Sequence, residues 1–127
     1  MITIKPISRL PRDLDWNAEA REALKHDVAL VEAGTRHMWM GEADVPLFVA
    51  GVYKPSVLLA GEFWIMFTRA FRARHFREGL RLLRVPVELY PQLFFRTMEG
   101  STTACRFAVA AGLKEIKRYH GLIEYKL

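Results

Sequence analysis

The sequence has very little cysteine and no long apolar run. Cys105 is the only cysteine among 127 residues, so no disulfide can form within the chain and a disulfide-stapled fold is excluded. The first ten residues, MITIKPISRL, contain no apolar run as long as that of a secretion signal. The longest apolar segments, such as FWIMF, are far too short to span a bilayer. These absences predict a soluble protein of a reducing compartment, with no membrane as a partner.

Motifs of several enzyme classes are also missing. The four histidines lack a metal-ligand spacing such as H-x-x-x-H, so no metal site is expected. There is no Gly-x-Ser-x-Gly nucleophile turn and no Walker-type phosphate loop. The chain also has no internal repeat, linker or low-complexity tract. We therefore expect one domain over residues 1–127, a length that can bury a sizeable core.

Charge is divided unevenly along the chain. Residues 1–63 hold seven Lys/Arg and nine Asp/Glu, whereas residues 64–127 hold twelve Lys/Arg and five Asp/Glu. The basic second half suggests a surface that faces an anion, which could be a phosphorylated cofactor, a nucleic acid or an acidic protein. A solvated face with no ligand is the alternative. The basic segment lacks interleaved aromatic residues and matches no nucleic-acid-binding signature, so nucleic acid is an unlikely partner.

The apolar pattern predicts strands and helices in alternation. Strand-like runs cover residues 2–7, 35–41, 46–53, 61–69, 92–98 and 115–127, the last with a bend at Gly121. A helix is expected over residues 18–34, capped by Asn17 and ended by Gly34. In the run from 61 to 69, Phe63, Ile65 and Phe67 should share one sheet face, and Trp64, Met66 and Thr68 the other. The predicted fold class is α/β, a single-domain mixed sheet in the order β-α-β-β-β-α-β-α-β.

Residues 69–84 predict an amphipathic helix. Four arginines recur three or four residues apart and should be exposed, whereas three apolar residues at the same spacing should be buried. The arginines are Arg74, Arg77, Arg81 and Arg84, and the apolar residues are Phe76, Leu80 and Leu83. Pro86 and Pro91 are expected to end this helix.

A second helix follows the strand at 92–98 and is unusually rich in small residues. Its sequence is GSTTACRFAVAAGL, with Phe107 as its one bulky apolar side chain. Ser101 or Thr102 should cap it, and Gly112 should take the left-handed conformation that ends it. Its alanines, Ala104, Ala108 and Ala111, share a face that would let the helix lie close to the sheet.

This order of elements resembles the GNAT acetyltransferase superfamily. Its members run strand, one or two helices, three antiparallel strands, helix, strand, helix, strand. Their last helix often reads Asn-x-x-Ala-x-x-Leu/Phe-Tyr and is followed by Gly-Phe. In STTACRFAVAAGL, Ser101 stands at the Asn position, Ala104 and Phe107 match, Ala108 stands at the Tyr position, and Gly112-Leu113 close the motif.

The resemblance implies acetyl-CoA as the cofactor and places its site. After the fourth strand the family has Gln/Arg-x-x-Gly-x-Gly/Ala, whose glycines let the backbone approach the pyrophosphate. Here the segment has no glycine until Gly79, and Arg69, Arg72 and Arg74 surround the expected phosphate position instead. The resemblance implies that the main chain of Phe67 pairs with the pantetheine arm and that Ser101 flanks it. The phosphates would lie beside Arg72 and Arg74.

The resemblance leaves the catalytic residues open. The family's Tyr, which protonates the leaving thiolate, is replaced by Ala108, which cannot donate a proton. Tyr90 and Tyr119 are candidates to substitute for it. Glu62 opens the fourth strand, where the family's general base often lies, and Glu42 is a second candidate.

Two classes of function remain open. The first is an acyl-CoA-dependent N-acyltransferase that acts on an amine of a small molecule or protein. The second is a non-catalytic GNAT-fold module for binding or structure. Small GNAT-like chains without the glycine motif also resemble internal virion proteins of some tailed bacteriophages, which would make virion or other phage proteins the partners. The corresponding locations are the cytoplasm and the virion.

Overall fold

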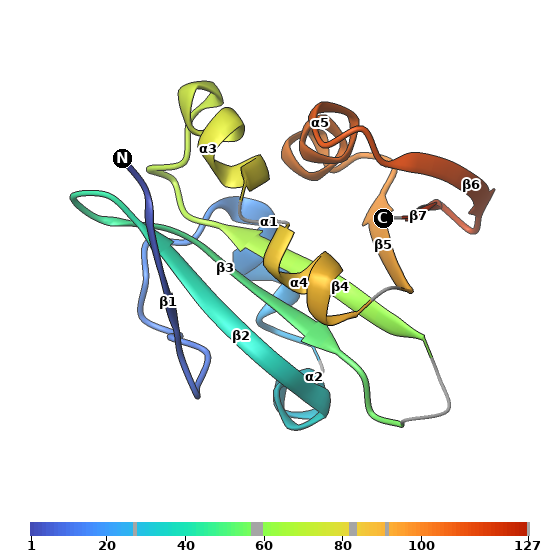
Figure 1. The fold of residues 1–127 in the computed structure, drawn as a ribbon, viewed down its shortest axis with the longest axis horizontal. Helices are drawn as coiled ribbons and strands as arrows, with labels where there is room; N and C mark the ends of the chain where they lie inside the picture. The colour runs from blue at the N-terminus through green and yellow to red at the C-terminus, as the bar shows by residue number, and fades with distance from the viewer. Residues whose placement is uncertain (27, 57–59, 82–83, 91, 127) are drawn as a thin grey trace.

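A computed structural model of the chain describes residues 1–26, 28–56, 60–81, 84–90 and 92–126, with only the backbone at residues 80 and 85–87. Its centre is a seven-stranded sheet in the order β1-β2-β3-β4-β5-β7-β6 (Figure 1). The strands are β1 (Thr3–Pro6), β2 (Thr35–Glu42), β3 (Pro46–Tyr53), β4 (Gly61–Phe67), β5 (Leu93–Met98), β6 (Lys114–Tyr119) and β7 (Leu122–Lys126).

The sheet is mixed, as predicted. Strands β1 to β4 are antiparallel neighbours, β5 lies parallel to β4, and β7 lies antiparallel to both β5 and β6. The parallel pair requires a crossover, which helices between β4 and β5 provide. The helical segments are α1 (Ala18–Ala23), α2 (Val28–Gly34), the 3₁₀ turn η1 (Ala73–His75), α3 (Phe76–Arg81), α4 (Arg84–Leu89) and α5 (Thr102–Ala110).

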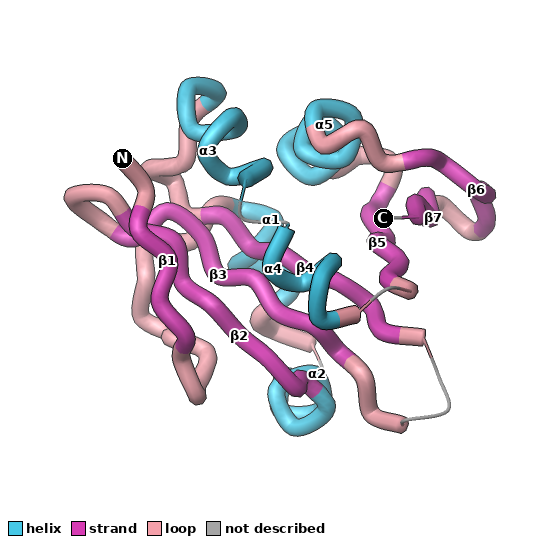
Figure 2. The backbone as a smooth tube through the Cα atoms, in the orientation of Figure 1, coloured by secondary structure: helices cyan, strands magenta, loops and turns pink. Residues whose placement is uncertain are grey.

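Helices cover both faces of the sheet. In Figure 1, α3, α4 and α5 lie in front of the sheet and α1 lies behind it, and Figure 2 shows the same layers. The front core joins Phe63 and Phe67 of β4 to Phe107 of α5. The rear core joins Met38 and Met40 of β2 to Trp16 and Ala20. The alternation predicted for β4 is confirmed, because Phe63, Ile65 and Phe67 belong to the front core and Trp64 and Met66 to the rear.

The helix predicted over residues 18–34 is two helices. Asn17 caps α1 as predicted, since its side-chain oxygen accepts from the Ala20 amide at 2.8 Å. The single-helix prediction is wrong because α1 tightens after Leu24, where Lys25 and His26 bond to carbonyls three residues back. The second helix, α2, ends at Gly34 as expected.

The arginine-rich helix is also divided. It begins with η1 at residue 73 rather than at Arg69, and a second helix, α4, starts at Arg84. Pro86 therefore does not end the helical region but lies in the first turn of α4, where amides have no intrahelical partner. The four arginines that recur along this segment are exposed as predicted, and Phe76 is half-buried. The Leu80 side chain, Leu83 and Pro91 lie outside the described residues.

The predicted last strand is a hairpin. Strands β6 and β7 pair around His120 and Gly121, whose φ angles are 49° and 76°. Two consecutive positive φ values define the two-residue turn that best matches the twist of paired strands. The chain therefore reverses at Gly121 instead of bending there.

Helix α5 lies against the sheet through its small face. Ala108 is fully buried, and Ala104 and Ala111 are packed against the same core, as the sequence predicts. The helix ends at Gly112, whose φ is 70°. The Gly112 amide bonds to the Val109 carbonyl and the Leu113 amide to that of Ala108, which is the two-bond pattern of a glycine-ended helix.

Candidate functional site

Strands β4 and β5 separate along their length. They pair only from Gly61 to Phe63 on β4 and from Leu93 to Phe95 on β5. Beyond that point β4 continues to residue 67 and β5 to residue 98 without pairing to each other. This separation, here called the splay, opens the sheet near its middle.

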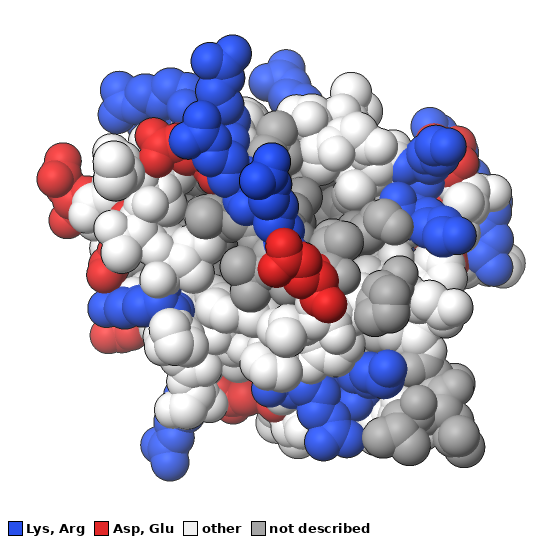
Figure 3. Space-filling model, in the orientation of Figure 1, with Lys and Arg blue, Asp and Glu red and all other residues white. Residues whose placement is uncertain are grey.

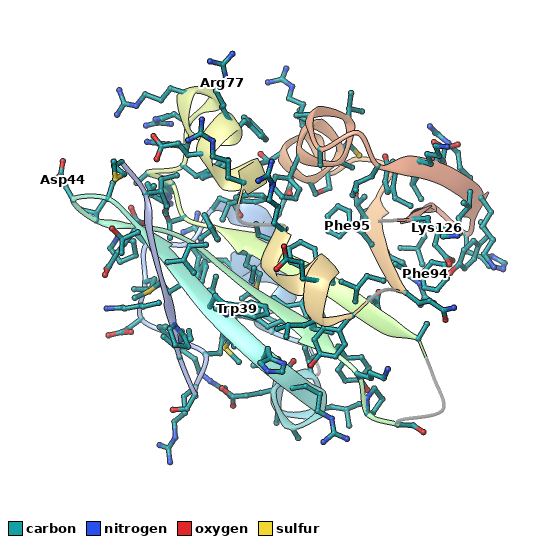
Figure 4. All side chains as sticks on the ribbon, viewed as in Figure 1. Trp39, Asp44, Arg77, Phe94, Phe95 and Lys126 are labelled. Atoms are coloured by element: carbon teal, nitrogen blue, oxygen red, sulfur yellow. The ribbon has the colours of Figure 1, made fainter. Side chains whose placement is uncertain are left out.

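The splay opens into a cleft of about 760 Å³. Its walls are mostly apolar and come from β4, β5 and α5, as Trp64, Met66, Phe67, Phe95, Met98 and Ala104. Side chains alternate along β5, so that Phe94 and Phe95 point to opposite sides of the strand (Figure 4). Polar groups enter from α1, β5 and the start of α5, as Glu19, Arg96 and Ser101. Such a cleft has the size and apolar character of a small-molecule site.

A second cavity of about 380 Å³ lies at the end of β4. It shares Asn17 and Phe67 with the cleft, so the two are neighbours. Arg69, Arg72 and Thr103 also line it, which brings the segment after β4 together with the first turn of α5. Arg72, a predicted cofactor residue, therefore lines this cavity, whereas Arg74, the other predicted arginine, is exposed and does not line it.

The edge of β4 that faces the cleft is partly used by the protein itself. The Thr68 amide bonds to β3 at Leu47, and antiparallel strands alternate their bonding sides, so Phe67 and Ile65 turn their main-chain groups toward the cleft. The Phe67 carbonyl accepts from the Asn17 amide at 3.0 Å. The Ile65 groups remain on the open edge. Of the two Phe67 groups expected to pair with a pantetheine arm, the carbonyl already has a partner.

The segment after β4 also uses its amides internally. The Arg72 amide donates to His75 Nδ1 at 2.8 Å, and the Arg69 amide donates to the Asp15 carbonyl at 2.9 Å. Burial and the neighbouring Arg74 guanidinium lower the pKa of His75. Both effects favour the neutral ring, the form in which a ring nitrogen can accept a hydrogen bond.

Ser101 lies at the N-cap position of α5, one residue before the helix starts, as predicted, but its side chain makes no capping bond. Its hydroxyl donates to Glu19 Oε2 at 2.5 Å. The predicted side-chain bond from Ser101 to its own helix is therefore wrong, because the hydroxyl is turned toward a charged acceptor on α1. The bond from Ser101 to Glu19 joins α1 to α5 across the cleft that both residues line.

Glu62 lies next to the point of separation, where β4 is still paired to β5. Its carboxylate is 3.8 Å from Arg96 Nε. Burial raises the pKa of Glu62; the charge of Arg96 lowers this pKa, and that of Glu124 raises it. Glu62 does not itself line the cleft, but Arg96 does. A half-buried carboxylate with a raised pKa in contact with a cleft residue is a candidate base.

Tyr119 belongs to the same charged network but lies farther from the cleft. Its hydroxyl donates to Glu124 at 3.2 Å. Glu124 is only 6 % exposed, and Arg96 and Lys117 lie 3.7 and 3.8 Å from it. Arg96 thus contacts both Glu62 and Glu124. Because Glu124 also bonds to Tyr119, Arg96 links the two catalytic candidates that the sequence predicts, Glu62 and Tyr119.

The other candidates lie elsewhere. Tyr90 hydrogen-bonds to His37, and Glu42 pairs with Lys5 at 3.1 Å. Ala108, at the position of the family's Tyr, is buried against the sheet.

The sequence pattern does not predict the contacts of several residues of the site. Asn17 is recognisable as a helix cap, but its amide contact to β4 is not. Arg96 alternates with apolar residues on β5, which signals a strand but not the carboxylates that it contacts.

Comparison of the structure with solved structures shows a GNAT fold. The chain is similar over its full length to the IAA acetyltransferase from Bacillus cereus, with 14 % identity, a TM-score of 0.69 and 100 % of that chain covered. A Bacillus subtilis acetyltransferase in complex with CoA gives 10 % identity and a TM-score of 0.70, with 100 % of this chain and 98 % of that chain covered. The Campylobacter jejuni N-acetyltransferase PseH in complex with acetyl coenzyme A gives 8 % identity and a TM-score of 0.65, with 100 % of this chain and 98 % of that chain covered.

Comparison by sequence finds no matching family model and no matching curated protein. Across the described ranges, no helix is long and apolar enough to span a membrane. The same part of the chain brings no three His, Cys, Asp or Glu side chains together as metal ligands.

Proposed function

We propose that this chain is an N-acyltransferase that moves an acyl group from a pantetheine thioester to an amine of a small molecule or protein. The observation that carries this proposal is the cleft of about 760 Å³ that opens where β4 and β5 separate. The Ile65 main chain on the open edge of β4 can pair with an extended arm in the manner of an added strand. The GNAT-fold structures that contain CoA or acetyl coenzyme A support the same ligand class.

Glu62 is the proposed general base. A pantetheine thioester supplies an activated acyl carbon, and Glu62 accepts the proton that the attacking amine must lose. Its raised pKa makes its carboxylate a stronger base than an ordinary glutamate. Arg96 holds this carboxylate in place at the separation point. Tyr119 stays a candidate acid that no observation tests.

The residues of the cleft and of the smaller cavity suit the pantetheine end of acetyl-CoA better than its diphosphate end. The apolar walls and the open β4 edge suit the pantetheine arm and thioester. The smaller cavity offers the guanidinium of Arg72 to phosphate, but the Arg69 and Arg72 amides already donate within the protein. Arg72 and Arg74 remain the proposed phosphate contacts, and Phe67 and Ser101 the proposed residues beside the arm.

The test combines donor binding with acyl transfer. Calorimetry with acetyl-CoA and acetyl-pantetheine is run on the wild type and on an Arg72→Ala, Arg74→Ala double variant. Thiol release is then followed with a panel of amines. Glu62→Gln should lower kcat by about 100-fold or more, the scale of a lost general base, with donor affinity changed less than twofold. Glu42→Gln is the matched control and should leave both values unchanged.

A non-catalytic module is the second candidate. Ala108 in place of Tyr and the Phe67 carbonyl bonded to Asn17 both favour it. If neither donor binds at millimolar concentration and no amine is acylated, the module is the better account. The resemblance to phage virion proteins, with virion proteins as partners, stays a prediction of that second candidate.

A further inference from the structure

The segment after β4 is poorly suited to a diphosphate. The amides of Arg69, Phe71 and Arg72 all donate within the protein. A diphosphate in a loop is usually held by several convergent amides, and these three already have partners within the protein. The guanidinium of Arg72 remains at the cavity, and one guanidinium can bind one phosphate through two parallel hydrogen bonds.

The neighbouring cleft retains the features of a site for a pantetheine arm. The smaller cavity and the apolar cleft share Asn17 and Phe67. A single phosphate beside Arg72 could therefore be continued by an arm that runs along the Ile65 edge toward Glu62. This is the outline of 4′-phosphopantetheine, without the adenosine and second phosphate of CoA.

Exposed arginines follow the cavity-lining Arg72 along the chain, and one more lies on α5. Together these are Arg72, Arg74, Arg77, Arg81, Arg84 and Arg106, here called the arginine surface. Figure 3 shows basic side chains gathered over α3, and Figure 4 shows Arg77 directed away from the core. Among the described residues, no carboxylate lies within ion-pair distance of these six. Elsewhere Arg12, Arg96 and Arg118 have such partners.

Glu78 is the one carboxylate on α3. It accepts from the Ile2 amide at 2.6 Å and forms no ion pair with any of the six arginines, whose side chains all belong to the described residues. The aromatic residues of the same segment, Phe71 and Phe76, pack into the core. They are not available to stack on bases, which disfavours single-stranded nucleic acid as the occupant.

We propose that the acyl donor is a phosphopantetheine thioester on an acidic carrier protein, which docks on the arginine surface. This inference rests on the proposed acyltransferase function. The arm enters past Arg72, and its thioester reaches the separation point beside Glu62. The amine nitrogen forms a bond to the acyl carbon, the carbon–sulfur bond breaks, Glu62 takes the amine proton, and the carrier thiolate leaves and takes up a proton from water. Because an acidic partner meets unpaired arginines, binding should weaken as salt is raised.

The experiment compares three donors, namely acetylated acyl carrier protein, acetyl-CoA and acetyl-pantetheine. The acetylated carrier should be used with a kcat/KM at least tenfold above that of acetyl-CoA. Arg77→Glu with Arg81→Glu should lower the kcat/KM of the carrier at least tenfold more than that of acetyl-pantetheine. Arg9→Glu with Arg21→Glu is the matched control, since both arginines are exposed and lie outside the arginine surface. It should change each rate less than twofold.

Binding of the carrier is measured separately by calorimetry. If no donor is used but the carrier binds and the Arg77, Arg81 variant abolishes that binding, the docking surface stands and the acyltransferase function fails. If the kcat/KM of acetyl-CoA equals or exceeds that of the acetylated carrier, the acyltransferase function stands and the carrier proposal is overturned. The carrier proposal is also overturned if the carrier does not bind, or if a labelled DNA or RNA duplex binds more tightly through the same arginines.

Discussion

Phe107 of α5 should be the side chain whose removal costs the fold the most. It is 1 % exposed, and its ring centroid lies between 5.8 and 6.5 Å from those of Phe63, Phe67, Phe76 and Phe95. These rings come from β4, β5 and α3, so Phe107 spans the two strands that separate at the cleft. Its loss would leave a cavity that both strands line.

The expected magnitude follows from the cavity and the ring contacts. Truncation of a buried Phe to Ala costs about 3–5 kcal/mol. Each well-oriented aromatic pair adds roughly 0.5–1.5 kcal/mol beyond the buried area. With four such neighbours, Phe107→Ala should lie at the upper end, near 4–5 kcal/mol. That is a large part of the roughly 5–15 kcal/mol that stabilises a typical domain.

Urea unfolding followed by far-UV circular dichroism and tryptophan fluorescence measures this loss. Val109→Ala on the same helix is the control, because Val109 is 73 % exposed and its change should stay within about 0.5 kcal/mol. Phe107→Leu should restore more than half of the loss. A loss below about 1.5 kcal/mol for Phe107→Ala, at an unchanged m-value, would refute the placement of this ring between the strands.

Four further predictions concern the charged network and two glycines. Glu124→Gln removes a charge that raises the pKa of Glu62, so an NMR titration should give Glu62 a lower midpoint than in the wild type; an equal or higher midpoint contradicts the network. In the wild type, the folded state holds the proton of Glu62 more tightly than the unfolded state does. The free energy of unfolding of the wild type should therefore fall relative to that of Glu62→Gln as the pH rises just above 4.5, which pH-dependent melts can check. Gly112→Ala should cost about 1–2 kcal/mol in thermal melts, because φ is 70° there, and a neutral result would exclude the left-handed helix end. Gly51→Ala should cost about 1–3 kcal/mol and shift tryptophan emission, because a Cβ would lie 2.6 Å from the Trp64 ring; unchanged emission would mean that Trp64 does not lie on Gly51.

Local pattern in the sequence was enough to predict much of this fold. Alternation along residues 63–67 correctly divided β4 between two cores, since side chains of a strand point to opposite faces. The spacing of Arg74, Arg77, Arg81 and Arg84 correctly placed them in solvent. The Asn17 cap and the Gly112 stop followed from backbone chemistry that depends on a few adjacent residues. The order of elements then predicted the mixed α/β sheet.

Tertiary structure alone decided which groups meet at the cleft. The Asn17 amide reaches the Phe67 carbonyl because a segment 50 residues earlier in the chain lies along the free edge of β4. Arg96 contacts Glu62 and Glu124 because β5 lies between β4 and β7, and that register is set by pairing across the sheet. Periodicity reports which face a residue occupies, because that depends on neighbours along the chain. It does not report which backbone edge stays open or which charges are brought together, because those depend on strands that the sequence separates.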